Sequence, residues 1–471
     1  MKDLFRKSAY ILLALFLSFA AIITQVHAGE MPVWESDTRY LSLEDVIRMA
    51  LENNRDIRIQ EEEVTYARAN ITQAQSKFFP QGSIGYTFTY NGSVMLSGSP
   101  LASQLSSKKD IGIYTGYKSD NLATLSGSQM VYDGGASIAN LKEARVKLKI
   151  QQETLVARKL EIEFEAKRLF YGLLLAYETL RINQDLVDQA RAHYKDVRSR
   201  FEQGTSSRFD ALQSKVQISK AIPPLVQAQN SIEIISNDMK KLLYLDMNCK
   251  IKLKESLRYS PIDVDLEGFL NEAYKNSPEM HLKVLGVDLE KWAIEFAKSP
   301  WYPNINATAN YFNRSDNINN WFNYRHSDWN IGIGGTISIF DGMSTLAKVK
   351  EARARYSQAI LTKENITEQI AVEVRRGCLD LKEAHAIILS QKDSLAEAKD
   401  ALNISYIGYD NGVMINLDVI DAQVSLSQVE KNLAGGIYDY LMAGAYLDRV
   451  MGREYISFYS NKPEEKDDKK E

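Results

Sequence analysis

Two stretches of the chain alternate between large apolar residues and small polar ones, a pattern that predicts β-strands with two different faces. One face carries Ile84, Tyr86, Phe88 and Tyr90 in the first stretch, and Trp329, Ile331, Ile333, Ile337 and Ile339 in the second. The other face carries mostly Gly, Ser, Thr and Asn. We therefore predict two β-hairpins, over residues 82–131 and 304–339.

The alternation fits either a sheet packed on a soluble core or strands that face lipid. Three features favour lipid. The strands are about 10 residues long, as tilted membrane strands are, and the second face is polar throughout. Aromatic residues also cluster near the strand ends, as an interfacial girdle requires; the candidates are Phe79, Trp301, Tyr302, Trp321 and Trp329. Four strands are too few to close a membrane barrel, so we expect several chains to share one.

We expect one helix before each hairpin, from Leu43 to about Phe78 in the first copy, and long helical runs after each hairpin. Helix-forming residues extend from Ala136 to Glu202 almost without interruption, a length of about 100 Å. Apolar residues that recur at every seventh position predict that these helices coil around one another. This heptad row consists of Ala166, Leu173, Leu180, Val187, Tyr194 and Phe201. The helices at about 207–244 and 416–451 should fold back antiparallel, with a kink or break at Pro223-Pro224.

The chain is built from two copies of one pattern. Residues 43–80 align without gaps on 266–303, and a second block starting at Tyr132 aligns on Phe340 at an offset of 208, which places Gly204 on Gly412. We assign the first copy to 29–246, with its helix pair at 136–245, and the second to 264–455, with its pair at 343–452. An irregular linker at 247–263 joins them, and the charged tail at 456–471 should be disordered.

The N-terminal 28 residues read as a secretory signal peptide, because basic residues precede a short apolar run and a cleavage site ending at Ala28. The remaining chain contains no apolar helix of the ~20 residues that a membrane span needs. Its formal net charge of −4 gives no indication of nucleic-acid binding. Cys249 and Cys378 could form a single bridge or stay free.

Enzyme motifs are missing from the sequence. It has no GxGxxG, P-loop, CxxC, HExxH or GxSxG pattern, and its five histidines lack the spacing of metal ligands. We therefore expect no catalytic, cofactor or metal site. The alternative to a membrane channel is a periplasmic coiled-coil scaffold, which would explain the heptads but not the two-faced strands.

Several motifs that follow one another along the sequence together resemble those of a known protein family. They are the opening segment 41–54, the helix-to-strand breaks at Phe79-Pro80 and Tyr302-Pro303, the strand-to-helix breaks at 132–135 and 340–342, and the segment 409–422. In this set the chain resembles the outer-membrane efflux protein family of TolC-like channels. The resemblance implies an α+β membrane protein: a homotrimer with a 12-stranded transmembrane β-barrel, four strands from each chain, continued by a coiled α-barrel through the periplasm. Such a protein would lie in outer-membrane lipid and serve as the exit duct of a tripartite efflux pump or type I secretion system, with a periplasmic adaptor, an inner-membrane pump and an iris-like gate.

The resemblance also implies where the gate lies. Asp418 and Asp421 match the constriction, Tyr409 and Asp210 match the gate contacts, and Gly204 and Gly412 mark the helix-turn tips. Met414 stands where the family has an arginine, and Arg208 is a candidate substitute. The simpler interpretation is that both aspartates stabilise the first turn of a helix capped by Asn416. Asp210 repeats Asp418 in the first copy, whereas Gln213 replaces Asp421, so capping does not explain Asp421.

Overall fold

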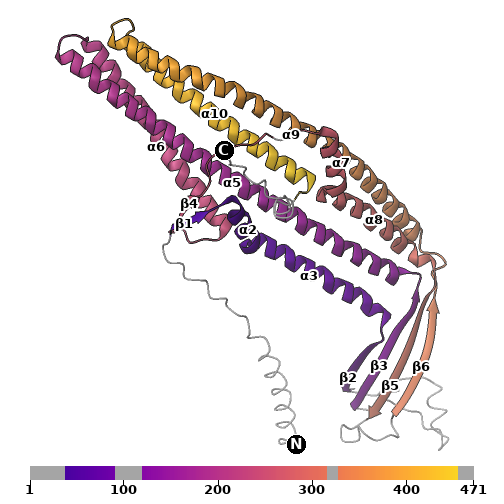
Figure 1. Ribbon diagram of the computed structural model, residues 1–471. Coiled ribbons are helices and arrows are strands. Elements are labelled where there is room, and N and C mark those ends of the chain that lie inside the picture. Colours follow the sequence, from indigo (N-terminus) through magenta and orange to yellow (C-terminus); the bar gives the residue numbers. More distant parts are fainter. Residues whose placement is uncertain (1–37, 91–118, 262, 316–326, 454–471) are drawn as a thin grey trace, which may run out of the picture.

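The computed structural model describes residues 38–90, 119–261, 263–315 and 327–453. The predicted signal peptide, the charged tail, Trp321 and the tips of both hairpins lie outside these ranges. The molecule is elongated, with a small sheet at one end and long helices running away from it (Figure 1). The turns between the paired long helices lie at the end opposite the sheet.

The two copies of the sequence pattern fold into the same series of elements. The first comprises β1 (Thr38–Leu41), α2 (Leu43–Asn53), α3 (Arg55–Gln75), η1 (Ser76–Phe78), β2 (Gln81–Tyr90), β3 (Ser119–Asp133), α5 (Ala136–Glu202) and α6 (Arg208–Leu243). The second comprises β4 (Lys250–Leu253), α7 (Leu266–Asn276), α8 (Pro278–Lys298), η2 (Ser299–Trp301), β5 (Asn304–Ser315), β6 (Ser327–Thr336), α9 (Ser344–Asp410) and α10 (Asn416–Met451). The predicted order of helix, hairpin and helix pair is thus confirmed in each copy.

In the helices and the linker, the structure differs from the sequence predictions at three points. The single helix expected before each hairpin is divided, and in the first copy the Asn54 side chain caps α3 by accepting a 2.8 Å hydrogen bond from the Asp56 amide. The segment expected to be irregular contains β4, which pairs in parallel with β1. Pro223-Pro224 does not break α6, where Asn183 of α5 donates a hydrogen bond to the Pro224 carbonyl at 3.2 Å.

The sheet is antiparallel with the strand order β2-β3-β5-β6. A β-bulge between Met130 and Tyr132 interrupts the pairing of β3 with β5, which locally increases strand twist. β6 ends at Thr336, so Ile337 and Ile339, which were predicted to be in the strand, lie beyond its end. Within the described part of the chain, β2 and β6 are edge strands with no neighbour on their outer sides.

The strands pass into the long helices through matched turns. Asp133 accepts a 2.8 Å hydrogen bond from the Ser137 amide, and Asp341 accepts one of 2.7 Å from the Thr345 amide. Gly134 has a φ of 69°, and a Cβ there would meet the Ser299 carbonyl oxygen at 2.2 Å. The turn therefore needs glycine both for its backbone conformation and for its close packing against η2.

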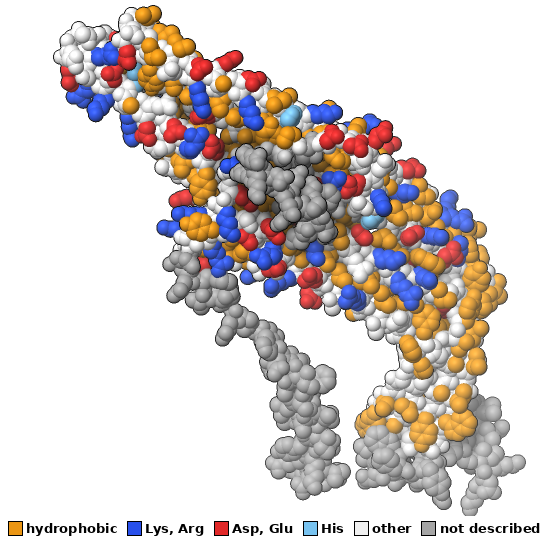
Figure 2. All heavy atoms as spheres, viewed as in Figure 1, with side chains coloured by type: hydrophobic (Ala, Val, Ile, Leu, Met, Phe, Trp, Pro, Cys, Tyr) orange, Lys and Arg blue, Asp and Glu red, His pale blue; other side chains and the backbone are white. Residues whose placement is uncertain are grey.

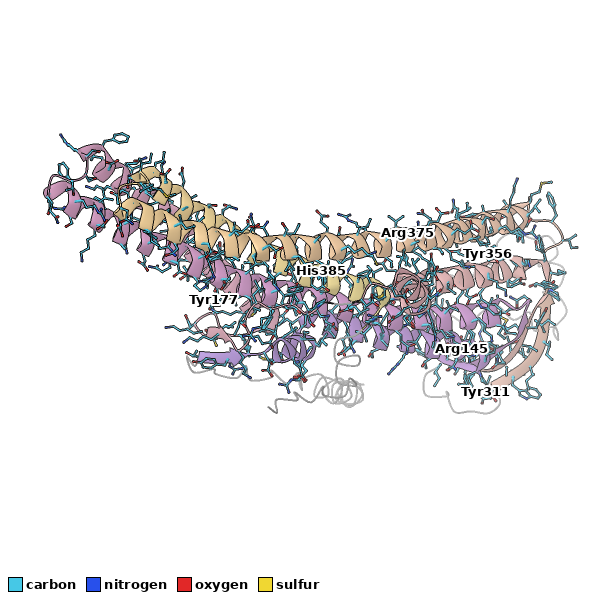
Figure 3. The ribbon with its side chains drawn as sticks, turned by 45° about the horizontal axis from the view of Figure 1, so that its top comes forward. Arg145, Tyr177, Tyr311, Tyr356, Arg375 and His385 are labelled. Carbon is cyan, nitrogen blue, oxygen red and sulfur yellow. The ribbon has the colours of Figure 1, made fainter. Side chains whose placement is uncertain are left out.

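Each repeat has its own hydrophobic core at mid-length. The first core joins α2, α5 and α6 around Phe170, and the second joins α7, α9 and α10 around Leu381 and Ile388. The predicted heptad row contributes Ala166, Leu173 and Val187, all fully buried, whereas its last member, Phe201, is exposed. In the view turned by 45°, α9 and α10 lie along one side of α5, and Tyr311 marks the sheet (Figure 3).

Candidate functional site

A continuous apolar row crosses one face of the sheet. Cross-strand pairing connects Ile84 to Leu125, Leu125 to Tyr311, and Tyr311 to Trp329, one residue from each strand. Directly paired residues lie on the same face. All four side chains are exposed, Ile84 by 85% and Trp329 by 68%. A face of this kind in a single chain needs a covering, which lipid or another protein can supply.

The opposite face carries a polar row at the adjacent positions. Pairing connects Ser83, Ser126, Asn310 and Asn330 across the four strands. Asn310 donates a hydrogen bond from Nδ2 to Asn330 Oδ1 at 3.0 Å. The sheet therefore separates an apolar face from a polar one over its whole width, as the alternation in the sequence predicts.

Charged residues in the strands occur only near the strand ends. β2 has none; β5 and β6 have one each, Arg314 and Asp328, close to the end away from the helices. β3 has Asp120 near its start and Asp133 as its last residue. Figure 2 shows the contrast, because blue and red side chains cover the helices while the visible sheet is orange and white. An uncharged band between two charged rims is what the membrane interior requires.

Four of the five residues predicted for the aromatic girdle lie in the described part of the chain. Phe79, Trp301 and Tyr302 lie at the junction of helices and sheet, and all three are exposed. Trp329 lies in the other half of the sheet, near the start of β6. Trp321 is outside the described residues. The described members thus occupy two levels of the sheet.

At the far end of the molecule, Gly204 and Gly412 end α5 and α9 in the same way. Their φ angles are 79° and 73°. The amide of the next residue donates back to the helix, from Thr205 to the Arg200 carbonyl and from Val413 to the Gly408 carbonyl, each at 2.8 Å. This is the glycine-terminated helix end that the two sequences predict.

Asp210 and Asp418 begin the returning helices by equivalent contacts. The Asp210 carboxylate accepts from the Ser207 amide at 3.3 Å, and the Asp418 carboxylate accepts from the Ile415 amide at 2.9 Å. Both aspartates therefore have a capping role. Asp421 is exposed one helical turn later on α10, on the same side as Asp418. A capping role does not explain why an aspartate stands at this position.

The basic group beside Tyr409 differs from the one that the sequence suggests. The guanidinium of Arg200 lies 5.0 Å from the centre of the Tyr409 ring and also pairs with Asp410. The Tyr409 hydroxyl bonds to Ser206, and burial raises the pKa of this tyrosine. Arg200 thus provides the basic group at this tip. Arg208, the substitute suggested by the sequence, is exposed and forms no ion pair among the described residues, and Met414 folds back against Gly408.

Asn416 is the residue whose position differs most from the sequence expectation. It was expected to cap α10, but Ile415 occupies the cap position and the Asn416 side chain is buried between the two helical hairpins. Its Oδ1 receives hydrogen bonds from His193 at 2.8 Å and Ser214 at 2.9 Å, and its Nδ2 donates to Gln213 at 2.9 Å. No sequence motif marks this group, because its members come from three helices, α5, α6 and α10.

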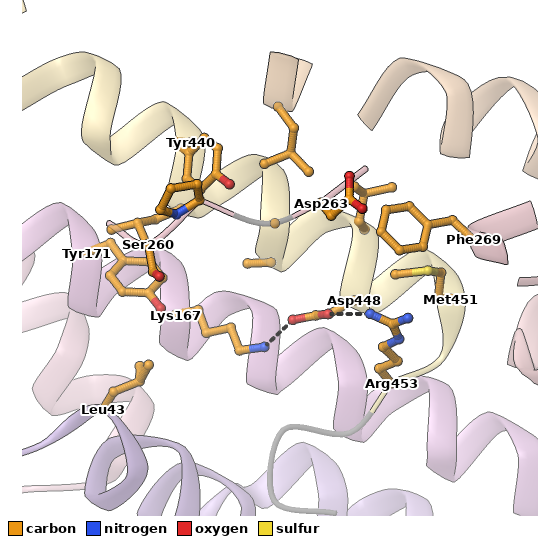
Figure 4. A pocket seen from close by; sticks show the side chains of 16 residues that line it. Leu43, Lys167, Tyr171, Ser260, Asp263, Phe269, Tyr440, Asp448, Met451 and Arg453 are labelled. Atoms are coloured by element: carbon orange, nitrogen blue, oxygen red, sulfur yellow. Dashed lines mark hydrogen bonds and ion pairs between the residues drawn. The ribbon is translucent and has the colours of Figure 1, made fainter. Parts of the chain in front are cut away.

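A cavity of about 610 Å³ lies at mid-length beside a buried charge cluster (Figure 4). Lys167 Nζ is 2.9 Å from Glu163 and 3.2 Å from Asp448. Burial raises the pKa of Asp448 against the opposing effect of Lys167. Each charge in the cluster has an opposite partner, which is the usual condition for burying charge, so the cluster holds α5 to α10.

Other site types can be addressed for the described residues alone. They contain no group of His, Cys, Asp and Glu side chains that could hold a metal ion. Cys249 and Cys378 are both buried, and no disulfide joins them. None of the helices in this part of the chain has a stretch apolar enough and long enough to span a bilayer.

Comparison with known proteins gives a consistent result. The family model described as Outer membrane efflux protein matches residues 46–243 and 269–453. Alkaline protease secretion protein AprF of Pseudomonas aeruginosa is 22% identical over 60% of this chain and 61% of its own length. Outer membrane protein TolC of Vibrio cholerae is 22% identical over 69% of this chain and 75% of its own. The match thus spans about three fifths to three quarters of these relatives.

Solved structures share the fold. The CusC channel superposes with a TM-score of 0.75 at 19% identity, covering 88% of this chain and 92% of CusC. The CmeC outer membrane channel of Campylobacter jejuni gives a TM-score of 0.77 at 16% identity, covering 87% and 85%. The two-part family match agrees with the duplicated architecture. The shared fold agrees with the two-faced sheet and the glycine-ended helical tips. The chain therefore belongs to the outer membrane efflux protein family and is an outer-membrane channel rather than an enzyme.

Proposed function

We propose that three copies of this chain assemble into one exit duct, with a shared 12-stranded β-barrel in the outer membrane and a tube of helices in the periplasm. The observation that carries the proposal is the sheet itself. Its four strands combine an exposed apolar face with open edges at β2 and β6. Unpaired backbone groups are too costly in lipid, so the edges must be paired by neighbouring copies.

The polar row of Ser83, Ser126, Asn310 and Asn330 would then line the lumen, and the apolar row through Ile84 and Trp329 would face lipid. The long helices run away from the sheet, at a marked angle to its strands, to the turns at the other end of the molecule (Figure 1). Three such chains around one axis would extend the lumen toward the helical tips.

The gate of this duct would lie at the tips, where Asp418 and Asp421 share one exposed side of α10. Three chains would bring six carboxylates to one constriction, and a ring of this kind favours cations over anions. Tyr409, Arg200 and Asp410 would hold the tip of the second hairpin against the first.

The partners of the duct would be a periplasmic adaptor and an inner-membrane pump. The relatives include both a protease secretion protein and a TolC channel, so efflux and type I secretion share the same architecture. The structure supports the duct in either system.

Membrane fractionation followed by planar-bilayer recording tests the proposal. The purified protein should come from the outer membrane, migrate as a trimer that heating dissociates, and conduct ions. The competing function, a periplasmic scaffold, would instead give a protein that washes off the membrane. A monomer without conductance would refute the shared barrel.

A further inference from the structure

The two β-hairpins of the chain have the same strand register. β2 and β5 begin at equivalent residues of the two copies, Gln81 and Asn304, and so do β3 and β6. In the first hairpin Gln81 pairs with Ser128. In the second, Asn304 pairs with Thr336, which is the equivalent of Ser128 at the offset of 208. Strand pairing therefore transfers from one repeat to the other residue for residue.

The strands that follow the hairpin tips end differently. β3 continues to Asp133, because its last residues pair with the start of β5. The residue equivalent to Asp133 is Asp341, but β6 ends at Thr336. Residues 337–341 have no strand partner in the described part of the chain, since β5 begins opposite Thr336. The greater length of β3 thus depends on the repeat that lies beside it, and β6 has no such neighbour in a single chain.

The helices next to the sheet show the same difference. α8 contacts both α9 and α5, and its side toward α5 is marked by His281, which lies 3.3 Å from Glu153. Its counterpart α3 packs against α5. On α3, Ile59 is 62% exposed, although the equivalent residue of α8, Leu282, is half-buried. On α9, the equivalent of Glu153 is Leu361, which is 63% exposed. α3 and α9 thus each expose an apolar side chain at the level where α8 meets α5.

We propose that adjacent copies bind each other as the two repeats bind within one chain. β6 and α9 of one copy pair with β2 and α3 of the next, and residues 337–341 become a continuation of β6. This interface rests on the proposed function, because it specifies how the copies of the duct meet. It uses the two edge strands, which lie at opposite sides of the sheet (Figure 1).

The strand register between copies follows from the pairing of β3 with β5. Transferred through the repeat, that pairing places Ile337 opposite Ile84 of the next copy and Ser338 opposite Ser83. The β-bulge of β3 recurs at Ile339. Each pair joins residues of the same character, apolar with apolar and polar with polar. The two faces of the sheet therefore continue from one copy to the next.

The helix contact between copies follows from the contact of α5 with α8. The equivalents of Glu153 and His281 are Leu361 and Arg58. Leu361 of one copy then lies beside Arg58 and Ile59 of the next, which brings the two exposed apolar side chains together. Burying them against each other stabilises the assembly.

Disulfide trapping tests the strand register. Ser83→Cys/Ser338→Cys should link copies, because directly opposite residues have Cα atoms about 4.5–5.5 Å apart, within the range of a disulfide. β3 and β5 separate the two positions in one chain, so the bond can form only between copies. Oxidation should convert most of the trimer into a covalent form that heating does not dissociate and a reducing agent does.

Ser83→Cys/Thr336→Cys is the matched control for the strands. It shifts one cysteine by two residues on the same face, where the diagonal separation is about 7–8 Å, so little covalent trimer should form. The unmodified protein, whose Cys249 and Cys378 are buried, gives the background.

Crosslinking of the helices is an independent measurement. A short bismaleimide should join copies in Arg58→Cys/Leu361→Cys. It should join far fewer in Arg58→Cys/Glu368→Cys, where the second cysteine lies two turns, about 10 Å, further along α9. All three positions are exposed, and this pair decides if the strand variants do not assemble.

The outcomes separate this interface from the duct itself. Equal or preferential crosslinking of the control pairs, or none in either set, overturns the repeat-like interface while a heat-dissociable, conducting trimer of the unmodified protein leaves the duct standing. An unmodified protein that is monomeric and does not conduct rejects the duct, and this interface with it.

Discussion

The guanidinium of Arg200 lies over the ring of Tyr409, with its central carbon 5.0 Å from the ring centre. The two residues belong to different repeats and face each other across the ends of α5 and α9. Arg200 also forms ion pairs with Asp196 of its own helix and with Asp410 of α9. It therefore joins the tips by a cation–π contact and an ion pair together.

Replacing Arg200 with alanine should increase the basal conductance of the channel. Cation–π contacts and exposed ion pairs contribute up to about 1 kcal/mol each, so we expect a rise of a few-fold. Asp410→Asn removes only the ion pair and should give a smaller rise. Arg198→Ala is the matched control, because Arg198 pairs with Glu202 within α5 and does not reach the other hairpin. Equal conductance in all variants would show that this contact does not restrain the tips.

Neutralising the two aspartates of α10 should lower cation selectivity. In Asp418→Asn/Asp421→Asn trimers, six negative charges leave the proposed constriction, and the reversal potential in a salt gradient should move toward that of a nonselective pore. The two positions should differ in their structural effect. Asp418 caps α10 through the Ile415 amide, and loss of a cap costs roughly 0.5–2 kcal/mol, whereas Asp421 has no capping contact.

Asp210→Asn provides the control for the cap. It weakens the equivalent bond to Ser207 on the first-repeat tip but should not alter selectivity. An unchanged reversal potential in the double variant would place the constriction elsewhere.

The fold was predictable from local patterns, whereas the junction of the tips was not. Ala136 and Glu202 bound α5 as the sequence indicates, because unbroken helix propensity ends at a glycine turn. The alternation of apolar and polar residues showed equally clearly which face of the sheet each strand residue occupies. β1 and β4 were missed because each has only four residues and pairs with a distant segment. Arg200 and Asn416 were missed because their contacts depend on how two independent hairpins lie together, and neither hairpin encodes that alone.

Acid should loosen the tip junction through His193. Burial lowers the pKa of His193 below its ordinary value of 6.5, against the effect of its hydrogen bond to Asn416. A separated tip would hydrate the ring and bind a proton more readily, so the closed junction loses stability as pH falls below about 6.5. The charged and titratable groups around the ring are Asp196 and Arg200 of α5 and Tyr406, Tyr409 and Asp410 of α9.

Open fraction measured between pH 7.5 and 5.5 checks this expectation. It should rise on acidification in the unmodified channel. In His193→Gln, whose amide can still donate to Asn416, the rise should be lost. His281→Gln is the matched control, since His281 lies on α8, away from the tips. A rise of the same size in His193→Gln would assign the pH response to other groups.

Adjacent residues of β6 should respond in opposite ways to the same substitution. Ile331 belongs to the apolar face and Asn330 to the polar face, because successive strand residues point to opposite sides. Lysine in place of a lipid-facing residue near the middle of a membrane costs about 2–4 kcal/mol, so Ile331→Lys should reduce the amount of heat-dissociable trimer. Asn330→Lys should assemble normally and shift selectivity toward anions, since its charge would enter the lumen. The two variants have the same added charge at nearly the same depth, which makes each the control for the other. If Asn330→Lys blocked assembly and Ile331→Lys did not, the polar face would be the one that meets lipid, and the orientation of the sheet in the duct would be reversed.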